Sequence, residues 1–316
     1  MSSLVENNNS SENGLRVLSL CGGVETGLYA LLKLGIPIRE YHTYEILPEA
    51  ISVSKHHFSW IIHHGDLYEA DFKQFKGFDL LLAGTNCQSL SRCRIEDKSV
   101  NSGLDGTSKI FFKAVEALKV IQPKYFMFEN VIPSSDEDLE TMTKCIGVEP
   151  VLINSEIFSA QSRERYYWTN ISLGDLPKQS SLVLEDIMEK NVNEKYFYKQ
   201  DFEILDMNKR ICAELKVNTF QMLRRIYNPK FKCCTLTCVR GGYQEKKVLD
   251  NGRPRKLTEI EYERLQGLPD NFTNVTINNR KLNYSKRCSL MGNGWNEQTV
   301  EWILSFMKEN QDADNS

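Results

Sequence analysis

Strand and helix patterns alternate along the first half of this 316-residue chain, and this alternation restricts its fold more than any other feature. Short apolar runs predict strands, and the amphipathic stretches between them predict helices. Strands are expected at 16–20, 41–45, 60–66, 78–84 and 124–130, and helices at 27–35, 48–57 and 107–123. Repeated strand, helix and strand units are typical of a doubly wound, mostly parallel α/β sheet.

Residues 1–14 and the chain after about residue 174 do not follow this alternation of strands and helices. Residues 1–14 are polar and lack an apolar core, so we expect a disordered tail. After about residue 174 short β-like runs mix with helical pieces at 181–190, 257–267 and 295–310. Between Arg224 and Lys256 there are ten Lys or Arg residues and two acids, a local charge of +8 in a chain of net charge −3. A charged binding surface, if present, is therefore expected to be local.

Composition excludes several other classes of protein. No apolar run approaches the ~20 residues that a membrane span requires, so no membrane partner is expected. The nine cysteines are scattered, which favours a reducing, cytoplasmic compartment over a disulfide framework. The one cluster, CCTLTC at 233–238, lacks a second CxxC or a histidine pair, so no zinc site is expected.

Polar and reactive residues follow the predicted strands. In a parallel sheet the carboxyl ends of the strands meet at one edge, where ligands bind. We therefore expect a site at this edge, built from Gly22–Gly23, Glu45, Asp66, Asn86–Cys87 and Glu129–Asn130.

Cys87 has two interpretations. At the end of a strand, before a long polar segment at 85–106, it is a candidate nucleophile. Free cysteines are more often core residues, so the residue alone leaves both open. Glu129, at the end of the neighbouring predicted strand, favours the nucleophile because a carboxyl beside a thiol is suited to acid–base chemistry.

The ends of the first three strands suggest an adenosyl cofactor. The glycine-rich turn at 22–27 permits close approach of the backbone to a ligand, Glu45 stands where an acceptor for ribose hydroxyls belongs, and Asp66 is placed to hold an adenine amino group. Each residue alone is equally a turn residue. The chain has no GxxxxGK[ST] motif, which argues against a triphosphate.

Taken in order, these segments resemble the cytosine-C5 DNA methyltransferases, in particular the de novo enzymes of animals and related phage and bacterial enzymes. The matching segments run from about residue 15 to 310: LRVLSLCGGVETGL, Glu45, GD at 65–66, AGTNCQSLS, FENV at 128–131, QSRERYYWTN at 161–170, RKLTEIEYERLQGLPDNFT at 255–273 and GNGW at 292–295.

The resemblance implies a Rossmann-like fold of the S-adenosylmethionine-dependent methyltransferase type with a smaller target recognition domain. It implies a catalytic domain at 15–174, target recognition at 175–255 and a return to the catalytic domain at 256–316. The implied substrate is cytosine in double-stranded DNA, flipped out of the helix. The implied donor is S-adenosylmethionine, with S-adenosylhomocysteine as product, and a monomer is the default state.

The resemblance also assigns roles to individual residues. It implies catalytic roles for Cys87, Glu129, Arg163 and Arg165. It implies cofactor binding by Leu20, Cys21, Gly22, Gly23, Thr26, Glu45, Ile46, Asp66, Leu67, Asn293 and Trp295. It implies substrate binding by Asn86, Gln88, Ser89, Asn130, Arg240 and Gly241.

Four positions depart from the family pattern. Asn86 replaces the usual proline before the nucleophile, Cys21 and Gly22 replace Phe and Asp or Ser, and Glu25 adds a carboxylate near the amino-acid end of the cofactor. Three interpretations follow: a methyltransferase with a divergent pocket, the same cytosine chemistry with another one-carbon or enlarged donor, or a non-catalytic DNA-binding homologue. A tRNA substrate is a further alternative.

Overall fold

The protein was analysed as a computed structural model that describes residues 13–85 and 109–314. The chain divides into two compact units. The first comprises Met1–Ile153, Glu164–Asp175 and Thr299–Ser316, and the second Asn154–Arg163 and Leu176–Gln298. The division near residue 175 lies close to the expected boundary at 174. Residues 256–298, however, group with the second unit, whereas the whole of 256–316 was expected to rejoin the first domain.

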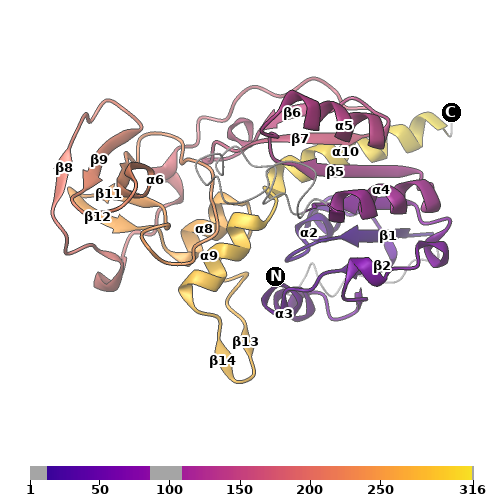
Figure 1. Ribbon diagram of the computed structural model, residues 1–316, viewed down its shortest axis with the longest axis horizontal. Helices are drawn as coiled ribbons and strands as arrows, with labels where there is room; N and C mark the ends of the chain where they lie inside the picture. Colours follow the sequence, from indigo (N-terminus) through magenta and orange to yellow (C-terminus); the bar gives the residue numbers. More distant parts are fainter. Residues whose placement is uncertain (1–12, 86–108, 315–316) are drawn as a thin grey trace. The chain divides into compact units, whose positions relative to one another are not determined.

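A seven-stranded sheet forms the centre of the first unit, and Figure 1 shows its central strands side by side. The strand order is β3-β2-β1-β4-β5-β7-β6. The pairs β3–β2, β2–β1, β1–β4 and β4–β5 are parallel, and β7 is antiparallel to β5. The strands are β1 (Leu15–Leu20), β2 (Ile38–Tyr44), β3 (Ile62–His63), β4 (Leu80–Ala83), β5 (Tyr125–Asn130), β6 (Val151–Asn154) and β7 (Glu164–Thr169). The predicted doubly wound α/β sheet is confirmed.

Three helices connect consecutive parallel strands: α2 (Thr26–Lys33), α3 (Pro48–His57) and α4 (Lys109–Ile121). The first unit also contains α5 (Asp136–Ile146), which follows β5, and the last helix, α10 (Glu297–Asp314). There are 3₁₀ turns at Leu67–Glu69, Phe72–Phe75 and Ser155–Ile157. The helix α5 was not predicted, although its sequence carries the signals. Ser135 accepts a hydrogen bond from the Asp138 N–H, and Gly147 ends the helix in the left-handed conformation.

Apolar side chains of β1, β4 and β5 pack against α4 and α5 in one cluster. Leu18, Leu81 and Trp168 are completely buried there, and Phe128 is 2% exposed. A strand buried on both faces reads as a continuous apolar run, which is why FDLLLAG and KYFMFEN were recognisable as strands. The core holds the strand ends rigidly and therefore fixes the residues that follow them.

The second unit contains a five-stranded sheet of order β12-β11-β10-β9-β8 and a hairpin that Figure 1 shows extending beyond α9. Its strands are β8 (Phe202–Ile204), β9 (Ile211–Leu215), β10 (Arg225–Tyr227), β11 (Lys247–Asp250), β12 (Arg253–Lys256), β13 (Thr276–Ile277) and β14 (Arg280–Lys281). Its helices are α6 (Leu184–Ile187), α7 (Gln221–Arg224), α8 (Glu259–Leu265) and α9 (Tyr284–Asn293), with a 3₁₀ turn at Glu194–Tyr196.

The helix expected over 181–190 forms only as the short α6, so that prediction was wrong in extent. Met188 is extended, and the Glu189 N–H donates to Glu261 at 2.9 Å. The Glu189 carboxylate also accepts a hydrogen bond from the Thr258 hydroxyl. These tertiary contacts compete with the local helical preference and end the helix early. Within the described residues, no helix has the length and apolar character to cross a membrane.

Replacing Gly292 by alanine is expected to destabilise the second unit by about 3 kcal/mol, because a methyl group there overpacks a rigid interior. A Cβ atom at this position in α9 would lie closer than 3.0 Å to backbone atoms of Thr237 and Cys238. Denaturant unfolding measures the loss, with Ser285→Ala on the same helix as control. Equal stability of the two variants would contradict this close packing.

Candidate active site

The strand ends of the first unit bring the predicted residues to one edge of the sheet. Gly22–Gly23 follow β1, Glu45 follows β2, and Asp66 follows β3. Glu129 and Asn130 are the last residues of β5, which is parallel to β4 and therefore ends at the same edge. Asn86, Cys87, Gln88 and Ser89 lie outside the described residues, so the roles predicted for them stay predictions.

Glu45 joins the ends of β1 and β2. Its carboxylate accepts hydrogen bonds from the backbone N–H groups of Gly23 at 2.9 Å, Ile46 at 2.8 Å and Leu47 at 2.9 Å. Three backbone donors hold the carboxylate in one orientation. Ile46 is 61% exposed, so its apolar side chain lies at the surface in the residue next to Glu45.

Asp66 is exposed and begins the 3₁₀ turn that follows β3, where its carboxylate accepts from the Tyr68 N–H at 2.9 Å. The side chains of Leu67 and Leu20 are 2% and 0% exposed and belong to the hydrophobic core. The cofactor-binding roles that the resemblance implied for Leu67 and Leu20 stay predictions.

The glycine-rich turn after β1 is tightly wound. Cys21, Gly23 and Glu25 all have left-handed backbone angles, with φ of 57°, 60° and 61°. A non-glycine residue in this region is uncommon and is held there by its surroundings. Cys21 is half-buried against the core, and Thr26, buried, begins α2.

Glu25 points into the protein interior. It is 1% exposed, and its carboxyl accepts hydrogen bonds from the Tyr41 hydroxyl at 2.7 Å and the Thr43 hydroxyl at 2.6 Å. Burial raises the pKa of Glu25 to about 7, the bonds to Thr43, Tyr41 and Ser19 oppose this rise, and the Glu45 charge adds to it. The structure thus gives the extra carboxylate a place beneath the turn.

Glu25→Gln is expected to remove a pH dependence of stability. The pKa of Glu25 is about 7 when folded, against an ordinary value of 4.5, so the folded state keeps a proton that the unfolded state releases. The contribution of Glu25 to the free energy of unfolding is therefore largest below pH 4.5, and it falls by about 3 kcal/mol as the pH rises through 7. Urea unfolding of both proteins across this range measures the difference. Identical slopes would contradict the assignment.

Glu129 and Arg165 form an ion pair at the end of β5. The Arg165 Nε lies 2.9 Å from Glu129 Oε1, and the two side chains are 13% and 10% exposed. Glu129 pairs with Tyr167 in the β5–β7 ladder. Arg165 is two residues from Tyr167 and so lies on the same face, diagonal to Glu129 and within reach of a long side chain.

Arg163 has other partners. Its guanidinium donates to the backbone carbonyls of Leu236 at 3.2 Å, Gly292 at 3.4 Å and Gly294 at 2.9 Å, all in the second unit. The resemblance implied a catalytic role for Arg163 as well as for Arg165. The strand β7 begins at Glu164, so the two-residue alternation does not extend to Arg163. Its contacts are those of a residue that holds backbone segments together.

Asn130 supports the segment that leads to Cys87. Its Nδ2 donates to the Thr85 hydroxyl at 3.3 Å, and its Oδ1 accepts from the Val131 N–H at 2.8 Å. Both Asn130 and Thr85 are buried. Thr85 was not among the predicted site residues, and the only signal for it was its position two residues before Cys87.

The remaining predicted residues lie in the second unit. Arg240 and Gly241 are exposed at a turn in which Gly241 has a φ of 105°. Asn293 is exposed and its Oδ1 lies 2.8 Å from the Cys238 thiol, while Trp295 is 7% exposed. The roles of Asn293 and Trp295 at the cofactor remain predictions.

Several basic side chains of the segment 224–256 form ion pairs or hydrogen bonds within the second unit. Arg255 is completely buried between Asp250 and Glu261, and Arg253 pairs with Glu194. Lys247 and Lys232 donate to backbone carbonyls. The local charge of +8 therefore overstates the positive surface, because sequence counts charges and not their partners.

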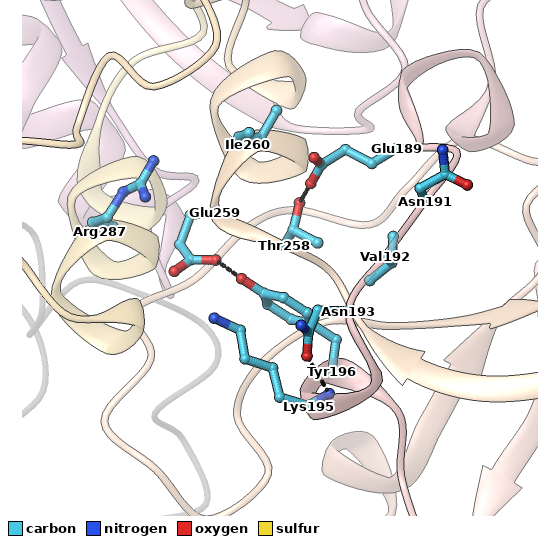
Figure 2. A pocket seen from close by; sticks show the side chains of 10 residues that line it. All are labelled: Glu189, Asn191, Val192, Asn193, Lys195, Tyr196, Thr258, Glu259, Ile260 and Arg287. Atoms are coloured by element: carbon cyan, nitrogen blue, oxygen red, sulfur yellow. Dashed lines mark hydrogen bonds between the residues drawn. The ribbon is translucent and has the colours of Figure 1, made fainter.

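A pocket of about 320 Å³ lies in the second unit. Figure 2 shows the side chains that line it. The Tyr196 hydroxyl donates to Glu259 at 2.5 Å, and the Thr258 hydroxyl donates to Glu189. These acids thus already accept hydrogen bonds from neighbouring side chains. The pocket contains none of the predicted site residues.

The family comparison and the similar curated proteins agree on one class of protein, the methyltransferases. Residues 15–308 match the family described as C-5 cytosine-specific DNA methylase. The orphan methyltransferase M.SPRI of Bacillus phage SPR is 30% identical over 219 residues, covering 65% of this chain and 46% of the phage protein. The type II methyltransferase M.NgoBI of Neisseria gonorrhoeae is 29% identical over 258 residues, covering 75% and 76%. The chain thus spans less than half the length of the phage relative.

Solved structures share the fold. The Dnmt2 methyltransferase of S. pombe superposes with a TM-score of 0.68 at 18% identity, covering 95% of this chain and all of that one. The EhMeth methyltransferase of Entamoeba histolytica superposes with a TM-score of 0.71 at 17% identity, covering 95% and 99%. The fold is therefore the Rossmann-like α/β fold of these methyltransferases.

Proposed function

Since the chain belongs to the family of C-5 cytosine-specific DNA methylases, we propose that it transfers a methyl group from S-adenosylmethionine to C5 of a cytosine in double-stranded DNA. The observation that carries this proposal is the Glu129–Arg165 pair at the end of β5, on the same sheet edge as Glu45 and Asp66. The carboxyl proposed to contact the cytosine, Glu129, thus lies at the same edge of the sheet as the two carboxyls proposed to bind the adenosyl group, Glu45 and Asp66.

The residues at this edge fit S-adenosylmethionine. Glu45 is held by three backbone N–H groups, two on Oε1 and one on Oε2, which leaves Oε2 able to accept a further hydrogen bond from a ribose hydroxyl. The exposed Ile46 offers an apolar face for adenine, and the exposed Asp66 offers an acceptor for its amino group. The bound donor would supply an electrophilic methyl group.

The protein side of the reaction needs a nucleophile and an acid. The Cys87 thiolate would add to C6 of the flipped cytosine, while Glu129 donates a proton to N3 and so neutralises the charge that develops on the ring. C5 then gains the methyl group and loses its proton, and the electrons of that C–H bond re-form the 5,6 double bond and expel Cys87. Arg165 holds Glu129 in place through their 2.9 Å contact.

We further propose that the first unit is catalytic and that the second recognises DNA. The exposed turn with Arg240 and Gly241 is suited to phosphate contacts, since arginine and backbone N–H groups commonly bind phosphate oxygens. The contacts of Arg163 with the backbone carbonyls of Leu236, Gly292 and Gly294 support a structural role, and its catalytic role stays a prediction.

Nucleoside mass spectrometry of DNA from cells that express the chain tests the proposed function. We expect 5-methylcytosine above the level in cells expressing Glu129→Gln, a matched variant that keeps the shape of the acid. Unmodified DNA, together with purified protein that binds no S-adenosylmethionine, would overturn the proposal. Modified tRNA with unmodified DNA would move the substrate to RNA.

A second candidate function has the same cytosine chemistry with a different donor. It is favoured by the departures at Cys21, Gly22 and Glu25, which all lie in the turn beneath the proposed donor site. Calorimetry separates the two: DNA binding without any heat from S-adenosylmethionine would favour the second.

A further inference from the structure

Gly22 and Glu25 share one space beneath the glycine-rich turn. A Cβ atom built on Gly22 would lie closer than 3.0 Å to both carboxylate oxygens of Glu25 and to the Ser19 hydroxyl. The carboxyl of Glu25 thus occupies the volume that a side chain at position 22 would take. The two residues are therefore coupled: a side chain at position 22 would have to displace the Glu25 carboxyl and the Ser19 hydroxyl.

Within residues 13–85 and 109–314, the groups that act on the Glu25 carboxyl include no cation. It accepts from Tyr41 and Thr43 of β2, and Ser19 of β1 contributes a third hydroxyl. The charged group that acts on it is Glu45, whose carboxylate holds the Gly23 N–H of the same turn. An ionised Glu25 would place a second negative charge beside the proposed donor site.

We propose that Glu25 is a positioning residue that makes the site prefer the cationic methyl donor over its neutral product. This inference rests on the proposed function. S-adenosylmethionine carries a sulfonium charge that S-adenosylhomocysteine lacks. In an interior of low dielectric, the ionised carboxyl of Glu25 attracts that charge over a longer distance than in water. Ionisation of Glu25 therefore favours the donor, and protonation removes the preference.

The physical basis for control by protons is the burial already described. Burial raises the pKa of Glu25 to about 7, so the carboxyl changes its charge close to neutral pH. The hydrogen bonds from Tyr41 and Thr43 hold the group in one place in the described structure. Only the charge, and not the position, then has to change to alter the preference.

Isothermal calorimetry with the full chain tests the inference. The ratio of the affinities for S-adenosylmethionine and S-adenosylhomocysteine is expected to rise about fivefold between about pH 6 and pH 8 in the unchanged protein. In Glu25→Gln the same ratio should follow only the ligands' own ionisation. The difference between the two proteins isolates Glu25, and circular dichroism confirms that both are folded.

A second pair of variants tests the shared space. Gly22→Ala alone is expected to weaken binding of S-adenosylhomocysteine at least about tenfold, because the new methyl group displaces the Glu25 carboxyl. Gly22→Ala combined with Glu25→Ala should recover most of this loss, since the Ser19 hydroxyl can rotate away.

The binding results distinguish failure of the inference about Glu25 from failure of the proposed methyltransferase function. If neither adenosyl ligand binds the unchanged protein at any pH, the proposed function fails. If both ligands bind but the affinity ratio has the same pH profile in Glu25→Gln, only the inference fails. Lack of recovery in the double variant would likewise overturn the coupling of Gly22 with Glu25.

Discussion

Cys87→Ala is expected to abolish the covalent adduct with DNA that contains 5-fluorocytosine. Fluorine at C5 cannot leave as a cation, so a methylated adduct remains attached to the thiol that formed it. Loss of the nucleophile should also lower the rate of methyl transfer by at least about 10³-fold. Denaturing gel electrophoresis of protein mixed with labelled duplex and S-adenosylmethionine detects the adduct.

Cys145→Ala provides the matched control. Cys145 is a half-buried free thiol of α5 in the first unit, away from the strand ends, and its removal should leave the adduct unchanged. An adduct that persists in Cys87→Ala would disprove the assignment of the nucleophile. Intact DNA binding in that variant would show that only the chemical step was lost.

Arg165→Ala is expected to lower methyl transfer by about 10²–10³-fold and the free energy of unfolding by about 2–3 kcal/mol. The substitution leaves the Glu129 carboxylate, which is 10% exposed, without the guanidinium that lies 2.9 Å away. Removing the guanidinium from a largely buried carboxylate is unfavourable, and the acid also loses the contact that orients it toward a base.

Two further variants separate these effects. Arg165→Lys should recover part of the rate, because an ammonium supplies the charge at one point but lacks the fixed planar geometry of the guanidinium. Arg163→Ala should destabilise the second unit by removing donors to three carbonyls. Equal rates for the unchanged protein and Arg165→Ala in single-turnover assays would contradict the role of Arg165.

Periodicity predicted the parallel strands of the first unit and the helices between them. Strands buried on both faces are continuously apolar, so the runs at 78–84 and 124–130 were recognised within two residues of β4 and β5. Parallel order then placed Glu45, Asp66 and Glu129 at one edge, because all parallel strands end on the same side. Helix α5 was missed although Ser135 and Gly147 marked its ends, since capping signals are weak beside a long apolar pattern.

Only the tertiary structure showed which partner each charged side chain contacts. Arg163 and Arg165 have the same side chain two positions apart, yet one holds carbonyls and the other Glu129, because the first residue of β7 lies between them. Arg255 looked like a surface charge and is completely buried between two acids.

The sequence by itself determined the order of the elements and the edge at which the acids gather. Both depend on hydrophobic period, which is a local property of the chain. Only the tertiary structure decided that Glu25 turns inward beneath Gly22 and that Leu67 belongs to the core. The direction in which a side chain points, and its burial, depend on contacts between residues far apart in the chain. A local sequence pattern carries no information about such contacts.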